Sequence, residues 1–393
     1  MRKLMANVQY FATPILILLC IFGIVKGGAW SWLGYWMLIA AIAVDMLTSK
    51  VHTAGAGLDE NGRLLGIPAL LNSMMYAMLP VFMLLQIALA WRVYQYVTGV
   101  PLGATEIFGL TVQNGITGWQ LAGATLSTGI WQGMGIIFGH ELAHTKGFSF
   151  VISRWMMALS GSAHFCFAHV YNHHLELGDE VDPATAPRGR SLYAHLVYSY
   201  FGQSMFSKGM EEARLKKMDK DFWSFDNRWI RGFAMSLPTV VLFSYAGGWF
   251  GVGIMFVVWV WSNFELEALN YMEHYGLIRV PGQPIEYRHS WDNSTAITSL
   301  AFIEIGRQAD HHDRGETHFW ELAPVGAPDG GWGYLHEFAV ALVPPLYHAI
   351  MKKKLAVWDR DYANPEERAI AQKVNRKVGY DVAPSENLAG VVI

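Results

Sequence analysis

The stretch Gly133-Met-Gly-Ile-Ile-Phe-Gly-His140-Glu-Leu-Ala-His144 carries an apolar run directly into two histidines that are four residues apart. Residues at positions i and i+4 share one face of a helix, so His140 and His144 can hold one metal from one side. Further on come His169-Val-Tyr-Asn-His173-His174, then His274 at the end of another apolar run, and then the pair His311-His312. Histidine is the commonest metal ligand among side chains. These eight histidines predict a site for more than one transition metal at the ends of membrane helices.

The composition agrees with a membrane protein. Of the 393 residues, 52% are hydrophobic and 16% are charged, whereas soluble proteins carry about 25% charged residues. The net charge of −3 gives no sign of a nucleic-acid partner. The two cysteines, Cys20 and Cys166, lie in apolar surroundings and form no CxxC pair, so we expect neither a disulfide framework nor an iron–sulfur centre.

Apolar segments long enough to cross a bilayer need about 20 residues. The sequence offers six candidates, and the fourth and sixth run directly into His140 and His274: residues 9–25, 30–47, 67–94, 109–138, 229–249 and 251–271. Gly247, Gly248 and Gly251 predict a tight turn between the last two. We therefore expect an all-α integral membrane protein in which six transmembrane helices carry a cytoplasmic helical cap.

The distribution of Lys and Arg predicts the orientation. One side holds Arg2, Lys3, Lys50, Arg63 and the basic segment 146–231, whereas the other holds little beyond Lys26 and Arg92. Both termini and all four histidine clusters should then face the cytoplasm, from a bacterial inner membrane. The expected divisions are residues 1–139 with helices one to four, 140–228 with the first histidine clusters, 229–272 with helices five and six, and 273–393 with the last cluster. The chain from Asp381 onward is expected to be a frayed tail.

The second histidine cluster can serve two metals. His169 and His173 repeat the four-residue spacing, which predicts that they hold one metal together, whereas His174 turns about 100° away. Imidazole ligands in this number favour iron, copper or zinc over calcium or magnesium. The neighbouring carboxylates of Glu141, Glu273 and Asp310 are candidates for fixing the histidine tautomers. No other catalytic residue and no organic cofactor is predicted.

The remaining histidines have a simpler interpretation. A lone histidine at a membrane interface is more often an interfacial polar group than a ligand. We expect this role for His52, His164, His195, His336 and His348, and we do not expect His289 or His318 to bind a metal.

The histidine clusters resemble the histidine boxes of integral-membrane diiron desaturases and hydroxylases. The similarity is greatest to the alkane 1-monooxygenase and xylene monooxygenase branch of this fatty acid desaturase-like superfamily. It rests on His140-Glu-Leu-Ala-His144-Thr, on His169-Val-Tyr-Asn-His173-His174 followed by Asp182-Pro-Ala-Thr-Ala-Pro, on Glu267-Ala-Leu-Asn-Tyr-Met-Glu-His274-Tyr-Gly, and on Arg288-His-Ser-Trp-Asp leading to Asp310-His311-His312. It extends over residues 67–358, and the third stretch discriminates best because desaturases lack it.

Two positions depart from that pattern. Ala168 stands where the branch usually has a glutamate, and Gln308 stands where it usually has a histidine. The nine histidine ligands of the branch become eight here, with Gln308 as a possible further ligand, because some front-end desaturases carry a QxxHH box.

The resemblance implies the chemistry. Two non-haem irons would activate dioxygen, place one oxygen atom in an apolar substrate as a hydroxyl group and release the other as water. The substrate would be an n-alkane oxidised at its terminal methyl or an aromatic compound oxidised at a methyl, reached from the membrane lipids. A rubredoxin or a ferredoxin-type donor would supply two electrons. Basic residues from Lys208 to Lys220 are either its docking site or a rim that contacts lipid headgroups.

Two alternatives and one ambiguity stay open. The chain could be a lipid desaturase or a fatty-acid hydroxylase of the same superfamily. A metal transporter fits less well, because its ligands should lie at mid-membrane. Gly133, Gly135 and Gly139 either allow close helix packing or open a wall to the substrate.

Overall fold

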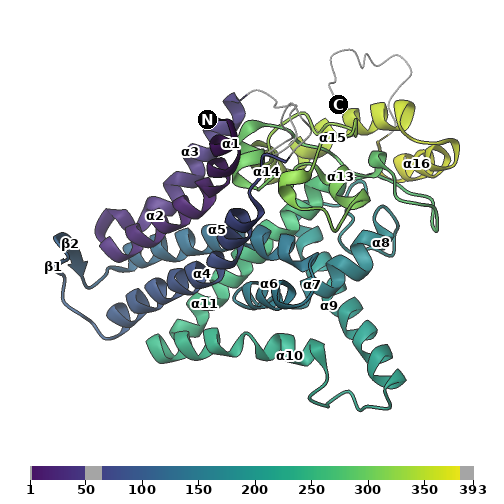
Figure 1. Cartoon of the computed structure of the whole chain (residues 1–393). Coiled ribbons are helices and arrows are strands. Elements are labelled where there is room, and N and C mark those ends of the chain that lie inside the picture. Colours follow the sequence, from purple (N-terminus) through teal and green to yellow (C-terminus); the bar gives the residue numbers. More distant parts are fainter. Residues whose placement is uncertain (1, 49–63, 381–393) are drawn as a thin grey trace.

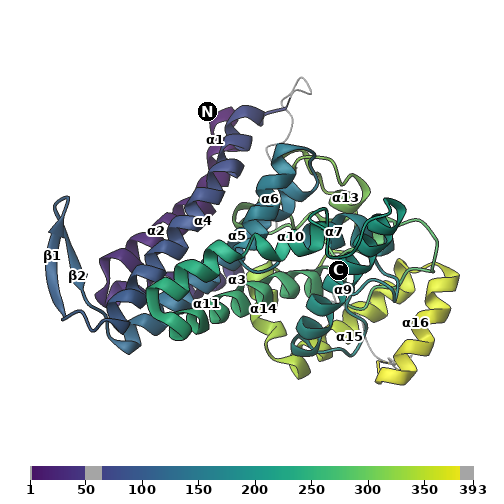
Figure 2. The same ribbon diagram turned by 90° about the horizontal axis from the view of Figure 1, so that it is seen from below.

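The computed structural model describes residues 2–48 and 64–380. His52 and the expected tail from Asp381 lie outside the described residues. The described part is mostly helical (Figure 1). The long helices run side by side from the β1–β2 hairpin at one end to the histidine-bearing segments at the other, an arrangement that Figure 2 shows from below.

The first half of the chain supplies most of the long apolar helices. Its elements are α1 (Arg2–Val8), α2 (Ala12–Lys26), α3 (Leu33–Leu47), α4 (Pro68–Val97), β1 (Gly103–Ile107), β2 (Leu110–Asn114), α5 (Gly118–Ala143) and α6 (Phe148–Ala158), with short 3₁₀ turns at Gln9–Phe11 and Gly28–Trp32. Arg92 is buried, and its guanidinium donates to the carbonyl oxygens of Ile24, Val25 and Gln113. Arg92 thus joins α4 to α2 and β2. It lies within a helix and not, as the sequence suggested, in a loop outside the membrane.

The second half continues with shorter helices around the histidines. They are α7 (Phe165–Ala168), a π-helical turn (His169–His173), α8 (His174–Glu176), α9 (Leu192–Lys217), α10 (Arg228–Ala234), α11 (Leu237–His274), α12 (Ala296–Ala301), α13 (Gln308–Asp313), α14 (Tyr334–Ala341), α15 (Pro344–Asp361) and α16 (Pro365–Val378), with 3₁₀ turns at Tyr287–His289 and Phe319–Glu321.

The expectation of six membrane helices is not met. Within the described residues, four segments are long and apolar enough to cross a membrane, which indicates an integral membrane protein: Ala6–Lys26, Gly28–Leu47, Pro68–Val97 and Arg228–His274. The expected start of the fourth span at residue 109 is wrong, because residues 103–114 pair as the antiparallel β1–β2 hairpin. The chain is therefore not wholly α-helical, and α5 begins only at Gly118, where Thr117 and Gln120 form a capping box.

The expected fifth and sixth spans form one apolar segment. At 47 residues, it would measure about 70 Å as a straight helix, more than twice the thickness of a bilayer core. It breaks at Gly247 and Gly248, whose backbones leave the helical region. Gly251 then packs against the carbonyl of Phe243, where a side chain would not fit. The predicted glycine turn is confirmed.

Helix α5 lies at the centre of the long helices. It contacts α3, α4, α6 and α11, and its residues from Ile130 to Ala143 are all buried. The glycines of α5 permit this, since a Cβ at Gly123 would overlap Trp32 and one at Gly135 would overlap Phe82. The packing holds the end of α5 that bears His140 firmly in place.

The segment after α11 closes over the same end of the long helices. The Arg188 guanidinium forms two hydrogen bonds with the Asp359 carboxylate of α15, at 2.7 and 2.8 Å. Arg188 also donates to the carbonyl oxygen of Gly276. Residues 273–380 are thereby fastened to the segment that carries His169, His173 and His174.

Candidate metal centre

The eight histidines come from four separate parts of the fold. His140 lies in the last turn of α5 and His144 directly follows that helix. The π-helical turn carries His169 and His173, and α8 begins with His174. His274 is the last residue of α11, and α13 carries His311 and His312. The structure brings all of them to one place beneath the C-terminal segment.

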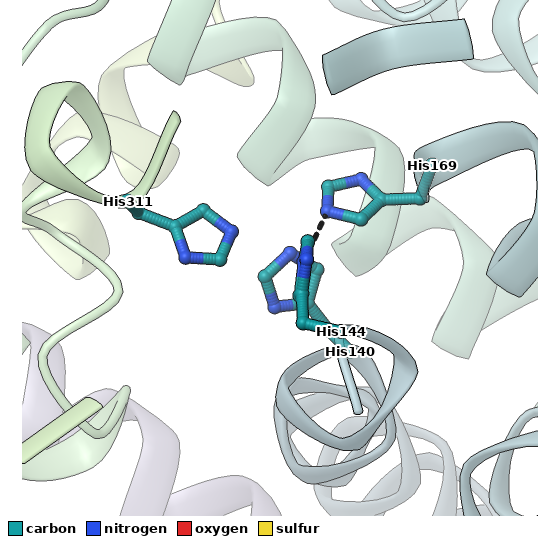
Figure 3. Close-up of side chains that lie close together, drawn as sticks. All are labelled: His140, His144, His169 and His311. Carbon is teal, nitrogen blue, oxygen red and sulfur yellow. Dashed lines mark hydrogen bonds between the residues drawn. The ribbon is translucent and has the colours of Figure 1, made fainter. Parts of the chain in front are cut away.

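Four histidines form a first group. One ring nitrogen from each of His140, His144, His169 and His311 lies within 4.8 Å of the others. The Nε2 atoms of His144 and His169 are 3.0 Å apart. Figure 3 shows His311 facing the other three from the opposite side. Four nitrogens that converge from three elements can surround a single metal ion.

Three histidines form a second group, His173, His274 and His312, whose ring nitrogens also lie within 4.8 Å of one another. All three residues are buried, and His274 is completely so. The His173 and His274 rings are 4.8 Å apart between centroids, and the His274 and His312 rings are 4.9 Å apart. This group can hold a second metal.

His174 lies between the two groups. Its Nε2 atom is 3.1 Å from His169 Nε2 in the first group. Its ring centroid is 4.3 Å from that of His312 in the second group. The structure therefore places all eight predicted ligands together, with His174 next to both metal positions.

The expected sharing of a metal by His169 and His173 is wrong, because these residues fall in different groups. The cause is the π-helical turn over His169–His173. In such a turn the hydrogen bond spans five residues, so residues four apart no longer lie directly above one another. Even so, one helical segment serves both groups, as the sequence predicted.

The free ring nitrogens fit a metal. Among the described residues, His140 Nδ1, His274 Nε2, His311 Nε2 and both ring nitrogens of His312 are buried without a hydrogen-bond partner. Burial and the neighbouring histidines hold the pKa of His169, His174 and His312 well below the usual value. Neutral imidazoles with unused lone pairs are the form that binds iron, copper or zinc.

Two histidines of the second group are oriented by neighbours. His173 Nδ1 lies 2.8 Å from the Asp182 carboxylate, which also accepts from the Thr185 hydroxyl. Burial alone would raise the Asp182 pKa, but His173 and these hydrogen bonds hold it below its ordinary value. His274 Nδ1 lies 3.4 Å from the carbonyl oxygen of His289. In both histidines Nε2 is therefore the nitrogen available to a metal.

Asp182 was not predicted to contact a histidine, although it begins the Asp182-Pro-Ala-Thr-Ala-Pro stretch that carried the resemblance. The three carboxylates that were predicted to fix histidine tautomers have other contacts. Glu141 accepts from the backbone N–H of Phe319, and Asp310 binds Arg314 and the N–H of Ala323. Glu273 is buried beside Gln308, which is itself buried. A role of these carboxylates in fixing histidine tautomers, and of Gln308 as a ligand, stays a prediction.

Of the histidines expected to lie outside the site, those in the described part of the chain belong to neither histidine group, but not all of them are interfacial. His164 and His195 are buried, because α9 packs against α7 and α11. His289 has both ring nitrogens engaged, by the N–H of Glu286 and by the Glu367 carboxylate. His318 and His336 stack on tryptophans.

The removal of the Asp182 carboxylate should weaken the second metal position. In Asp182→Ala, His173 loses the group that fixes its tautomer and its ring direction. Loss of such a partner costs about 10- to 100-fold in metal affinity. Competition with a chelator measures it, and Asp179→Ala, an acid of the same loop without a contact to a histidine, is the control. An unchanged affinity in Asp182→Ala would contradict this role.

Two small apolar cavities lie along α5, and one of them reaches the first group. That cavity is lined by His140 together with Ile137, Phe165, Leu266 and Ile305. The other is lined by Leu38, Met134, Phe302 and Phe338. Gly133 and Leu269 border both cavities. An apolar molecule that extends past Gly133 would point one end toward His140.

Known proteins are similar to this chain over most of its length. The chain is 28% identical to the xylene/toluene monooxygenase hydroxylase component XylM of Pseudomonas putida, over 96% of each chain. It is 30% identical to an alkane 1-monooxygenase of Ectopseudomonas oleovorans, over 68% of this chain and 69% of the relative. It is 29% identical to alkane 1-monooxygenase 1 of Alcanivorax borkumensis, over 72% of this chain and 67% of the relative.

These relatives confirm the predicted class of enzyme, an oxygen-dependent monooxygenase. The pattern of the family described as Fatty acid desaturase matches residues 117–336. That range runs from α5 through α13 and contains all eight histidines. With more than half of its length matched, this chain belongs to the fatty acid desaturase family.

Proposed function

We propose that this protein is a membrane diiron monooxygenase that hydroxylates an unactivated methyl group of an apolar substrate. The substrate would be an n-alkane, oxidised at its terminal methyl, or a compound with an aromatic methyl. The observation that carries the proposal is the convergence of two histidine groups, the first of which borders an apolar cavity through His140. The names of the relatives support the reaction type.

The proposed ligands are His140, His144, His169 and His311 for one iron and His173, His274 and His312 for the other. His174 would reach either iron, and Gln308 is a possible further ligand. Two bound irons would supply the activation of dioxygen, with the balance RH + O₂ + 2e⁻ + 2H⁺ → ROH + H₂O. Membership of the fatty acid desaturase family favours iron over other metals at these two positions.

The protein's own residues prepare the site for this reaction. Asp182 and the carbonyl of His289 fix the rings of His173 and His274. The residues Ile137, Phe165 and Leu266 exclude water around His140 and favour a hydrocarbon over a polar molecule. The cavity thus selects the substrate by its apolar surface and positions a methyl next to the centre.

The electrons would come from a rubredoxin or a ferredoxin-type donor on the cytoplasmic side, where the histidine-bearing end of the long helices would lie. Lys216 and Lys217, at the end of α9, are exposed. Their charge would attract an acidic carrier, and this attraction should weaken as the salt concentration rises.

Labelled dioxygen tests the reaction. The purified protein, loaded with iron and supplied with electrons, should convert an alkane or a methylarene to an alcohol that contains one labelled oxygen atom. The screen covers n-alkanes, toluenes and fatty acids. An unlabelled alkene as the product would identify a desaturase instead. Zinc without iron, and no dioxygen consumption, would contradict any oxygenase.

A further inference from the structure

An acidic side chain borders the apolar cavity. Glu265 lies in the second half of α11, and it lines one of the two apolar cavities together with Leu38, Met134 and Phe338. Charged and acidic side chains inside membrane helices are costly, and they commonly mark a functional site. The proposed oxidation of a hydrocarbon gives no use for this carboxyl group.

The hydrogen bonds of Glu265 are incomplete. Oε1 accepts from the indole N–H of Trp261 at 2.6 Å, one turn earlier on α11. Oε2 is buried and makes no hydrogen bond of normal geometry within the described residues, although the carboxyl group lies within reach of the backbone N–H of Met134 on α5. It lies against Gly133, at which even a Cβ atom would overlap the carboxyl group. A buried polar atom with an incomplete hydrogen bond is costly, so a ligand that supplies a well-aligned hydrogen bond would relieve this cost.

We propose that Glu265 determines specificity by accepting a hydrogen bond from a hydroxyl group at the far end of the substrate. The preferred substrate class is then an apolar molecule with an alcohol at one end and an unreacted methyl at the other. This inference rests on the proposed function, because it assumes that the methyl end lies next to His140.

The spacing along α5 sets the length of such a molecule. Gly133, which faces Glu265, and His140, which faces the metal centre, are seven residues apart on one continuous helix. Seven residues correspond to about 10 Å at 1.5 Å per residue. A primary alcohol of medium chain length spans this distance, whereas methanol or ethanol does not.

Two probes of equal size separate a hydrogen bond from simple packing. We compare 1-octanol, which carries a hydroxyl donor, with 1-methoxyheptane, which has the same number of carbon and oxygen atoms but no donor. Each is tested for the Michaelis constant of methyl oxidation and for the rise in unfolding temperature that it causes in the iron-loaded protein in lipid nanodiscs. The natural chain should favour the alcohol by about tenfold, as one well-placed hydrogen bond permits.

The variants then assign the preference to Glu265. Glu265→Leu and Glu265→Ala should abolish the tenfold preference, whereas Glu265→Gln, which can still accept a hydrogen bond, should keep most of it. Glu106→Gln alters an exposed acid on β1, at the far end of the molecule, and should change nothing. Two truncating variants are used so that the test does not depend on the folding of one.

An undiminished preference for the alcohol in both truncating variants would overturn the proposal, as would equal binding of the two probes by the natural chain. The thermal measurement keeps this result apart from a failure of the proposed function. If no probe is oxidised but the alcohol still stabilises the natural chain more than the Glu265→Leu variant, the role of Glu265 stands and the hydroxylase proposal fails.

Discussion

The His274→Ala variant is expected to lose oxidation activity completely and to hold at most one iron per chain. His274 is fully buried, and its Nε2 atom has no partner within the described part of the chain. It is one of three histidines in its group, so alanine leaves only His173, His312 and the shared His174 beside that metal position. Without the buried His274 nitrogen, we expect the iron to be lost from this position. Metal analysis of the purified variant, together with product formation from n-octane, measures both effects.

His348→Ala is the matched control. His348 is partly buried, and its Nε2 atom contacts the carbonyl oxygen of Arg190 and the hydroxyl of Tyr271. It belongs to neither histidine group, so this variant should keep both its iron and its activity. Two irons and full activity in His274→Ala would overturn the ligand assignment.

The Gly133→Leu variant is expected to bind iron normally but to lose about 100-fold or more in the oxidation of long substrates. Gly133 borders both apolar cavities, and a side chain there would overlap the Glu265 carboxyl group. A leucine would therefore push into the lining that the two cavities share and displace a long substrate from the centre, and misplacement by about 1 Å can cost 100-fold in rate. The comparison of n-octane with toluene measures this, because the smaller molecule needs less of the two cavities.

Gly253→Leu controls for the insertion of a leucine into a membrane helix. Gly253 lies on α11 with no atom within 4 Å of the position that a Cβ would take. It should leave the turnover of both substrates unchanged. If Gly133→Leu oxidised n-octane as fast as the natural chain, the substrate would not pass Gly133.

The structure resolves the two interpretations of the glycines in α5 residue by residue. Gly135 packs against the ring of Phe82, and Gly139 packs against Met156 and Met157, so these two serve close helix packing. Gly133 packs closely against Glu265 of α11 and in addition borders both cavities. The sequence could not separate these roles, since the neighbour of a glycine on another helix does not follow from the spacing of glycines along its own helix.

Local sequence patterns were reliable wherever the physical cause was itself local. The glycine turn at Gly247 and Gly248 follows from residues that leave the helical region readily. The hairpin at 103–114 escaped the search for apolar runs, because such a search averages over residues and does not detect strand pairing. The search for apolar runs therefore placed the start of α5 nine residues too early, at Gly109 and not at Gly118.

By itself, the sequence determined the membrane character, the enzyme family and the eight histidines, because hydropathy and the spacing of ligand residues are properties of the chain. Only the tertiary structure decided how these histidines divide between two metal positions. That division depends on the π-helical turn that separates His169 from His173 and on the approach of α13, which lies more than 130 residues beyond them. The same holds for Asp182 and Glu265, whose surroundings are assembled from helices that are distant in the sequence.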